Sequence, residues 1–183
     1  KQMKKLILIL TLIFGAISFS ANEVKAFDSL NTAAEEYRKV LQELVNFKSR
    51  EEFNEGGDNL GNYLKSSGNT ELEKKWETIK NKIAEPYEIK ANSPKMKGTN
   101  GATVDYDVYG YDEGKLTEVI DQNIQEFVQQ EEDGTLLIDM EKYLLSVEEF
   151  VNKTKKIKVA VTTMEFEKVS GKWMLKEKGE FEN

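Results

Sequence analysis

Two aspartates and two tyrosines stand together in the segment 104–109, and this combination could perform acid–base chemistry. A carboxylate such as Asp105 or Asp107 acts as a general base when an apolar cavity raises its pKa, and Tyr106 or Tyr109 could then donate a proton. Both aspartates alternate, however, with apolar residues at every second position, which predicts a β-strand whose carboxylates point to water. We therefore assign no catalytic residue and keep an isomerase- or dehydratase-like enzyme as the alternative function.

The sequence carries no other catalytic, metal-binding or cofactor signature. Asp105, Asp107 and Gly110 match positions of an EF-hand loop, but Leu116 stands where that loop needs a bidentate glutamate, so only weak calcium binding near 112–113 stays open. The glycine-rich segment 56–61 lacks the Gly-Lys-Ser/Thr ending of a phosphate-binding loop. Histidine and cysteine are both absent, which removes the usual base of serine and cysteine hydrolases. We expect no metal and no cofactor.

Six aromatic residues could line a pocket for a small apolar ligand, because such pockets combine aromatic walls with a few polar groups. They are Tyr37, Trp76, Tyr106, Phe127, Tyr143 and Trp173. Aromatic side chains at helical or strand spacing more often form ordinary core, and that reading is favoured. The tyrosine hydroxyls, which need polar partners, keep the pocket open as a hypothesis.

The charge distribution argues against nucleic-acid binding. The net charge is −7, and it falls to −10 if Lys1, Lys4 and Lys5 are removed with a signal peptide. A strongly acidic domain is repelled by phosphates, and the only arginines are Arg38 and Arg50. A lysine-rich strip follows a predicted helix end, where cations complement the helix dipole; it comprises Lys153, Lys155, Lys156 and Lys158.

The first residues have the composition of a secretory signal peptide. Lysines precede a short apolar run from Leu6 to Ile17, and small residues follow at Ser18 and Ser20. The run is shorter than the ~20 residues that span a bilayer, so we expect cleavage after Ser20, with Ala26 as the alternative end. We therefore expect export to the periplasm or the cell exterior. Without cysteine we expect no lipid anchor, and after cleavage no integral membrane segment.

Helical periodicity and capping residues predict several helices. An apolar stripe begins after Asn31, with Thr32 and Glu35 as a capping box, and a second capping pair at Ser49 and Glu52 predicts a separate helix. A third helix runs from 70 and ends before Pro86. Helical spacing returns over 116–128 and again over 140–151, and Asp133-Gly134 marks a break between these two helices.

Two hairpins alternate with these helices. Alternation over 87–91 and 104–108 surrounds an Asn-Gly turn, and a second hairpin turns at Ser170-Gly171, with Phe166 opposite Leu175 and Lys168 opposite Trp173. A β-bulge near 162–163 would bring two apolar sets of the third strand to one face. The expected fold is a single α+β domain over 27–183, with a curved four-stranded antiparallel sheet packed against several helices.

Both hairpins resemble those of a known superfamily. The run Gly101-Ala-Thr-Val-Asp-Tyr-Asp-Val108 and the closing segment 166–175, with its Gly-Lys-Trp turn, are similar to hairpins of small secreted bacterial domains of the nuclear-transport-factor-2-like (cystatin-like α+β) superfamily. The resemblance implies a cone-shaped fold over about 30–180. Superfamily enzymes use Asp, Tyr or His inside the cone, and the lack of histidine here rules out the His-dependent variants.

Three functions follow from these patterns. The first is a non-enzymatic exported module that binds a small apolar ligand or a protein partner. The second is the carboxylate- and tyrosine-dependent enzyme, and the third is a structural, envelope-associated protein. A homodimer formed through the sheet stays open. The enzyme requires a carboxylate buried in a cavity, and the ligand-binding module requires that the cavity exist.

Overall fold

The computed structural model describes residues 25–55, 57–112, 114–115, 118, 122 and 126–176. The chain divides into two compact units, which are described separately below. The sheet unit comprises described residues within 25–48, 87–110 and 158–176, and the helical unit those within 49–86 and 111–157. The predicted signal peptide lies outside the described residues, apart from the last two residues of its alternative form.

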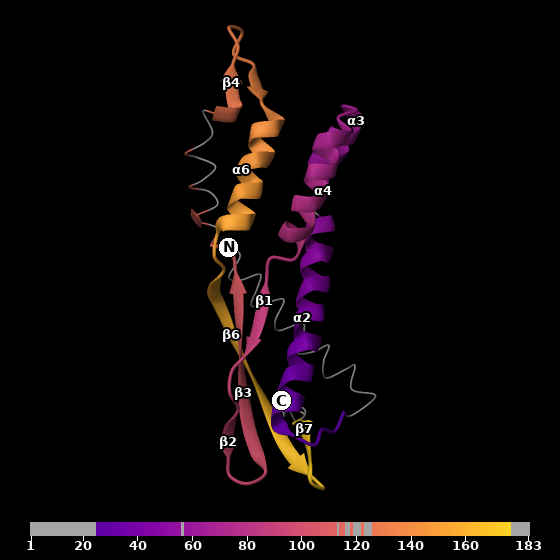
Figure 1. The fold of residues 1–183 in the computed structure, drawn as a ribbon, viewed down its shortest axis with the longest axis vertical. Helices are drawn as coiled ribbons and strands as arrows, with labels where there is room; N and C mark the ends of the chain where they lie inside the picture. Colours follow the sequence, from indigo (N-terminus) through magenta and orange to yellow (C-terminus); the bar gives the residue numbers. More distant parts are fainter. Residues whose placement is uncertain are drawn as a thin grey trace, which may run out of the picture. The chain divides into compact units, whose positions relative to one another are not determined.

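The sheet unit confirms the predicted α+β class with an antiparallel sheet (Figure 1). Its strands are β1 (Glu88–Ala91), β2 (Lys95–Lys97), β3 (Gly101–Gly110), β6 (Ile157–Val169) and β7 (Lys172–Leu175). They pair in the order β1-β3-β6-β7, and β2 also pairs with β3. The sheet thus has five strands where four were predicted. The additional strand, β2, follows the predicted first strand after Pro94, which has no N–H to donate.

The closing hairpin has the register that the sequence predicts. Phe166 pairs with Leu175 and Lys168 pairs with Trp173 across a two-residue turn. Ser170 and Gly171 have φ values of 50° and 82°, and two successive positive φ angles are the requirement of a type I′ turn. This turn chemistry, together with the apolar alternation on both sides, specifies the register.

In strand β6, the change from odd-numbered to even-numbered residues facing the core comes earlier than predicted. The consecutive residues Val159 and Ala160 both pack against the core, and Thr162, Met164 and Phe166 are buried. Val161 is exposed instead of facing the core, so the irregularity lies at 159–160 and not at 162–163. One strand can therefore contribute apolar residues of both parities to a single core.

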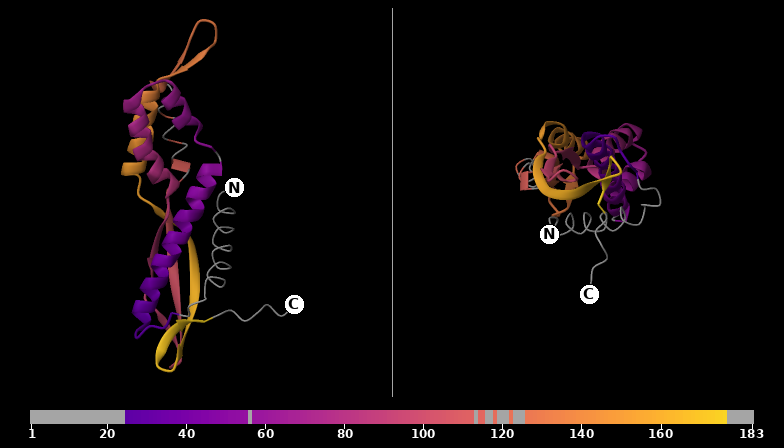
Figure 2. Two further views of the ribbon diagram at one scale, coloured as in Figure 1. Left: turned by 90° about the vertical axis from the view of Figure 1, so that its right-hand side faces the viewer. Right: turned by 90° about the horizontal axis from the view of Figure 1, so that it is seen from below.

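Helix α2 (Leu30–Glu55) supplies the helical part of the sheet unit's core, and its first turns lie across one face of the sheet (Figures 1 and 2). Its start is capped by Ser29, whose hydroxyl accepts from Thr32 N at 3.1 Å, and not by the predicted pair of Thr32 and Glu35. Among the described residues, α2 is the only helix in this core, so the prediction of several helices against the sheet is corrected. The buried core residues are Ala33, Ala34, Leu41, Val45, Ile89, Ala102, Val104, Tyr106, Val108, Met164, Phe166 and Trp173.

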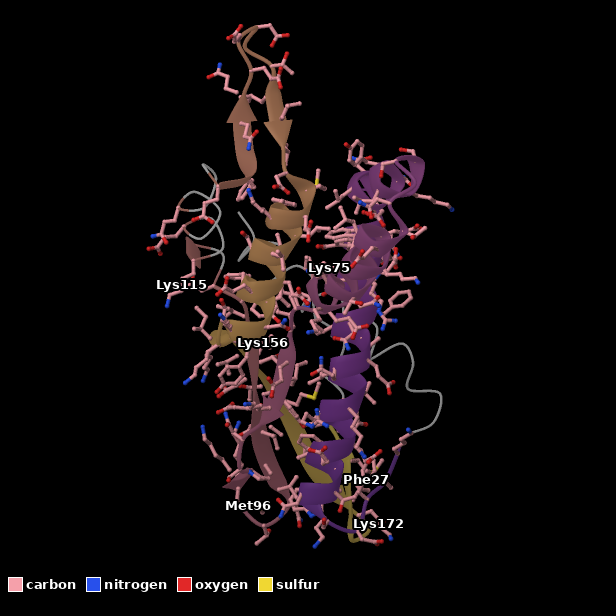
Figure 3. All side chains as sticks on the ribbon, turned by 45° about the horizontal axis from the view of Figure 1, so that its top comes forward. Phe27, Lys75, Met96, Lys115, Lys156 and Lys172 are labelled. Carbon is pink, nitrogen blue, oxygen red and sulfur yellow. The ribbon has the colours of Figure 1, made fainter. Side chains whose placement is uncertain are left out.

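Side-chain and backbone hydrogen bonds cover part of each lateral edge of the sheet, at β1 and at β7. At β1, the amide of Gln42 accepts from Ile89 N at 2.8 Å and donates to the Tyr87 carbonyl oxygen at 3.0 Å, which are bonds that another strand would otherwise make. At β7, Phe27 exchanges two backbone hydrogen bonds with Trp173, at 2.9 and 2.8 Å. Figure 3 places Phe27 at the same end of this unit as Lys172, which pairs with Asp28. Closed edges discourage pairing with other sheets.

The helical unit contains α3 (Asn59–Ser66), α4 (Thr70–Ala84), α6 (Met140–Lys153) and the hairpin of β4 (Val128–Gln130) and β5 (Leu136–Ile138). Its buried core consists of Leu64, Trp76, Ile79, Leu144, Val147, Phe150 and Val151. Helix α4 packs beside α6, where Lys75 lies 3.3 Å from Glu148 (Figure 3). The third predicted helix is confirmed, although Asn69, and not Thr70, caps it.

One helix prediction in this part of the chain is wrong: Ser49 does not begin a helix, since α2 continues through it to Glu55. The helix predicted over 116–128 lies largely outside the described residues. Of those described within it, Glu118, Gln122, Glu126 and Phe127 are helical, and the last, Val128, belongs to β4.

Asp58 joins three groups of the helical unit. Its carboxylate caps α3 by accepting from Gly61 N at 2.9 Å, and it also accepts from Trp76 Nε1 at 2.9 Å and from Lys80 Nζ at 2.6 Å. Burial alone would raise the pKa of Asp58, but the hydrogen bonds from Lys80, Gly61 and Trp76 outweigh it and lower that pKa. The carboxylate therefore ties the start of α3 to the middle of α4.

Candidate functional site

The surroundings of Asp105 make it a poor general base. Its carboxylate accepts from Lys95 Nζ and from Thr163 Oγ1, each at 2.6 Å, on the sheet face opposite the α2 core. The hydrogen bond from Lys95, followed by that from Thr163, lowers the pKa of Asp105. A general base at neutral pH needs the opposite shift, so this geometry supports a structural ion pair.

Asp107 differs from the prediction in its burial. It lies on the same polar face as Asp105 but retains only 7% of its surface exposed, whereas the alternation predicted a carboxylate in water. β3 is a central strand, and Lys90 stands opposite Asp107 on β1. Lys158 approaches Asp107 Oδ1 to 2.7 Å without forming a hydrogen bond of good geometry. Neighbouring strands thus cover Asp107, which faces a cation and not an apolar cavity.

Tyr106 is a core residue with a satisfied hydroxyl. Its side chain is fully buried, and its hydroxyl donates to the Ala34 carbonyl oxygen of α2 at 3.0 Å. Burial, with smaller contributions from Tyr37 and Glu35, raises the pKa of Tyr106 far above the usual range. Tyr109 is partly exposed, with Lys90 Nζ 4.8 Å from its ring centre. The proposed acid and base residues therefore do not converge on one space.

Replacing Tyr106 by phenylalanine should lower the free energy of unfolding by about 1 kcal/mol, because one buried hydrogen bond is lost while the ring packing is kept. Chemical denaturation monitored by circular dichroism measures the change. Tyr109→Phe, at a partly exposed position, is the matched control and should change stability by less than about 0.5 kcal/mol. Equal effects at the two positions would contradict the structural role of the Tyr106 hydroxyl.

The six predicted pocket residues fall into two groups. Tyr37, Tyr106 and Trp173 pack in the core of the sheet unit, where Tyr37 stacks edge-on with Phe166 at 5.6 Å. Trp76, Phe127 and Tyr143 belong to the helical unit, where the rings of Phe127 and Tyr143 meet edge-on at 5.6 Å. A depression of about 250 Å³ is lined by none of the six; its lining includes Lys97, Asn100, Glu165 and Lys176. All six have packing roles in their own unit.

The lysine-rich strip has structural partners. Lys153 pairs with Glu149 one turn earlier in α6 at 2.5 Å, and Lys156 lies over the ring of Tyr111 at 5.3 Å. With Lys158 at Asp107, three of the four cations are engaged in local contacts. Across the described residues, no group of three metal-ligating side chains occurs.

The β4–β5 ribbon, residues 128–138, is the most unusual surface of the helical unit. Three successive aliphatic residues of β5, Leu136, Leu137 and Ile138, are 62%, 46% and 54% exposed. In Figure 1 and in the left view of Figure 2 the ribbon extends beyond the helices of its own unit. Three adjacent exposed aliphatic residues on a strand are unusual for a surface that faces only water, and such patches mark interaction sites.

Within the part of the chain that the structure describes, one backbone edge of the ribbon is also unpaired. Val128 pairs with Ile138, Gln129 with Leu137 and Gln130 with Leu136. Flanking bonds run from Glu131 N to the Thr135 carbonyl oxygen at 2.8 Å and from Asp139 N to the Phe127 carbonyl oxygen at 2.7 Å. Since hydrogen-bonded pairs alternate along an antiparallel ribbon, the backbone of Leu137 faces β4, and the N–H and C=O groups of Leu136 and Ile138 face outward.

Carboxylates surround the aliphatic strand. The turn carries Glu131, Glu132 and Asp133, all exposed, and oxygen atoms gather at its tip in Figure 3. The side chain of Asp133 accepts from Thr135 N at 2.8 Å, which stabilises the turn, and hydrogen bonds from Thr135 lower the pKa of Asp133. Gly134 has a φ of 85°, as this turn requires.

Sequence reasoning missed this ribbon although a signal was present. Asp133-Gly134 is a hairpin turn sequence, but from the sequence alone it is interpreted as a break between two helices. Leu136, Leu137 and Ile138 do not alternate with polar residues, so the usual period of a half-buried strand is lacking.

Comparisons with protein-family models, with curated proteins and with solved structures each found no match. In the part of the chain that the structure describes, no helix combines the length and apolar character needed to cross a bilayer.

Proposed function

We propose that this protein is an exported, non-enzymatic interaction module that docks a protein partner through the β4–β5 ribbon. The observation that carries the proposal is the exposure of Leu136, Leu137 and Ile138 on one strand. Export rests on the lysine-initiated apolar segment at the start of the chain. The resemblance to cystatin-like α+β domains remains part of the proposal, supported by a curled antiparallel sheet with one helix across it.

Burial of the three aliphatic side chains would supply a substantial part of a binding free energy. Complete burial of a leucine or isoleucine side chain contributes about 1.5–3 kcal/mol, and these three are about half exposed before binding. A small cluster of this kind is sufficient for the energetic centre of an interface, whose polar rim contributes little.

The geometry favours docking over the small-ligand and enzyme alternatives. The aromatic residues that would line a pocket are engaged in packing, and the lowered pKa of Asp105 is unsuited to a general base. The hydrogen bonds that cover β1 at Ile89 and β7 at Trp173 likewise disfavour a homodimer formed by pairing these two strand edges.

Site-specific photocrosslinking in the protein's own host tests the proposal. A photoreactive phenylalanine analogue at Leu137 should give one dominant protein adduct, whereas the same analogue at Tyr63 on α3, which is 57% exposed, should not. Excess unmodified protein should suppress the adduct, and a triple variant with serine at 136, 137 and 138 should fail to do so. Equal adducts from both positions, or suppression by the triple variant, would contradict docking at the ribbon.

A further inference from the structure

We propose that the outer edge of β5 accepts an extended partner segment as a third strand, and that this segment combines aliphatic residues with lysine or arginine. The inference rests on the proposed function and specifies the partner's conformation and charge. It is carried by three properties of the ribbon: its outward backbone groups, its exposed aliphatic side chains and its acidic surroundings.

The backbone of β5 is suited to strand addition. The N–H and C=O groups of Leu136 and Ile138 face away from β4, as the pairing of Leu137 with Gln129 requires. Within the described residues, no hydrogen bond satisfies them. An isolated two-stranded ribbon is marginally stable, so an added strand both satisfies these groups and stabilises the ribbon.

The side chains of β5 require an apolar counterpart on each face. Leu136 and Ile138 point to one face of the ribbon and Leu137 to the other, because successive residues of a strand alternate. A third strand would place its own side chains beside these residues on both faces. Aliphatic residues in the incoming segment would thus cover the exposed leucines and isoleucine.

The charge around β5 selects a basic partner. From 131 to 141 the chain carries Glu131, Glu132, Asp133, Asp139 and Glu141 and no lysine or arginine. Lys142 follows, and it lies 3.2 Å from Asp139. The strand therefore has carboxylates at both ends, and lysine or arginine at the ends of the added strand would face them.

The same charges argue against a second copy of this chain as the occupant. Antiparallel pairing of two β5 strands would bring the acidic turn of one copy next to Asp139 and Glu141 of the other. Like charges placed across a strand pair are destabilising. Self-association through β5 is therefore expected to be weaker than binding of a basic segment.

Fluorescence anisotropy with the full chain and three labelled peptides tests the inference. The first peptide alternates valine and isoleucine, so that both faces are aliphatic, and has two lysines at each end. The second replaces the lysines with glutamates, and the third keeps the lysines but contains a central proline. The lysine peptide should bind at least about tenfold more tightly than either of the others, and its affinity should fall with salt. Equal binding of the glutamate peptide or of the proline peptide would overturn the proposal.

A pair of variants separates the backbone contribution from the side chain. Leu136→Pro removes an outward N–H while leaving the internal bonds of Leu137, and Leu136→Thr keeps the N–H. Only the proline variant should lose most of the affinity for the lysine peptide, with circular dichroism showing that both fold. Equal binding by the two variants, or a dimer of the free protein that Leu137→Glu dissociates, would overturn strand addition by a basic segment. If crosslinking from Leu137 persists while the lysine peptide fails to bind, this inference fails and the proposed function stands.

Discussion

Replacing Asp58 by alanine is expected to lower the free energy of unfolding by about 2–4 kcal/mol. Loss of the α3 cap costs about 1 kcal/mol, and an unsatisfied buried donor at Trp76 Nε1 costs about 1–3 kcal/mol more. Urea denaturation followed by tryptophan fluorescence measures the change. Asp133→Ala, which removes an acceptor at an exposed turn, is a control and should cost much less.

Gly61→Ala should reproduce much of this loss of stability although Asp58 itself is left unchanged. In a helix interior, alanine normally stabilises by up to about 1 kcal/mol relative to glycine. Here a Cβ on residue 61 would lie 2.4 Å from Asp58 Oδ2, so the cap must move away. Asn62→Ala, at an exposed position of the same helix, is the matched control and should be neutral or stabilising. Stabilisation by Gly61→Ala would contradict the capping geometry.

The contribution of Asp58 should depend on pH with a defined sign. Because its folded-state pKa lies below the ordinary value of 3.8, the stabilisation is complete above that value and is lost as the pH falls through the folded pKa. The stability difference between the wild type and Asp58→Asn should therefore shrink on acidification. A difference that stays constant from pH 7 down to about pH 2 would show that the charge of Asp58 makes no contribution.

The second large effect is expected at Gln42. Gln42→Leu keeps the side-chain volume but removes the hydrogen bonds that Gln42 makes with Ile89 N–H and with the Tyr87 carbonyl, and we expect a loss of about 2–4 kcal/mol. Gln42→Glu retains an acceptor for Ile89 but loses the donor to Tyr87, so its effect should be intermediate. Thermal and urea denaturation of the three proteins measure this order.

An open β1 edge should also favour association. Gln42→Leu exposes the strand edge that the amide normally closes, and we expect concentration-dependent oligomers in sedimentation velocity. Glu43→Leu adds the same apolar surface at an exposed position of α2 and leaves the edge closed, so it should remain as monodisperse as the wild type. Similar association of both variants would show that added apolar surface, and not the open β1 edge, causes the oligomers.

The sheet was the most predictable part of the structure because several local signals agree there. The Ser170-Gly171 turn, the alternation around it and the placement of Trp173 specify one register, which the structure confirms. The valines and Tyr106 of β3 were assigned to the core for the same reason. Burial of Asp107 was not predictable, because it depends on which strands lie on both sides of β3.

Helix boundaries were less predictable, because capping residues compete with tertiary packing. Ser49 and Glu52 have the spacing of a capping box, yet Ser49 follows Leu41 and Val45 at intervals of four and is buried within α2. The interruption comes later, where Gly57 adopts a φ of 75° and Asp58 caps the next helix. A capping pattern identifies a helix start only when the backbone can leave the helix there.

The candidate site could not be derived from residue types. Aromatic periodicity identifies buried positions but does not reveal that Tyr37 and Trp76 belong to different cores. The ribbon depends on exposed aliphatic residues at 136–138, whereas the usual reading places such residues inside. Only the arrangement of the hairpin shows that they face outward.

Residue-resolved amide exchange of the free protein tests most directly whether β5 has an unoccupied outer edge. The N–H of Leu137 points to Gln129 and should exchange more slowly than the N–H groups of Leu136 and Ile138, which point outward. Protection of Leu136 and Ile138 equal to that of Leu137 would mean that the edge is already occupied. In that case neither the docking surface nor the added strand could be as described.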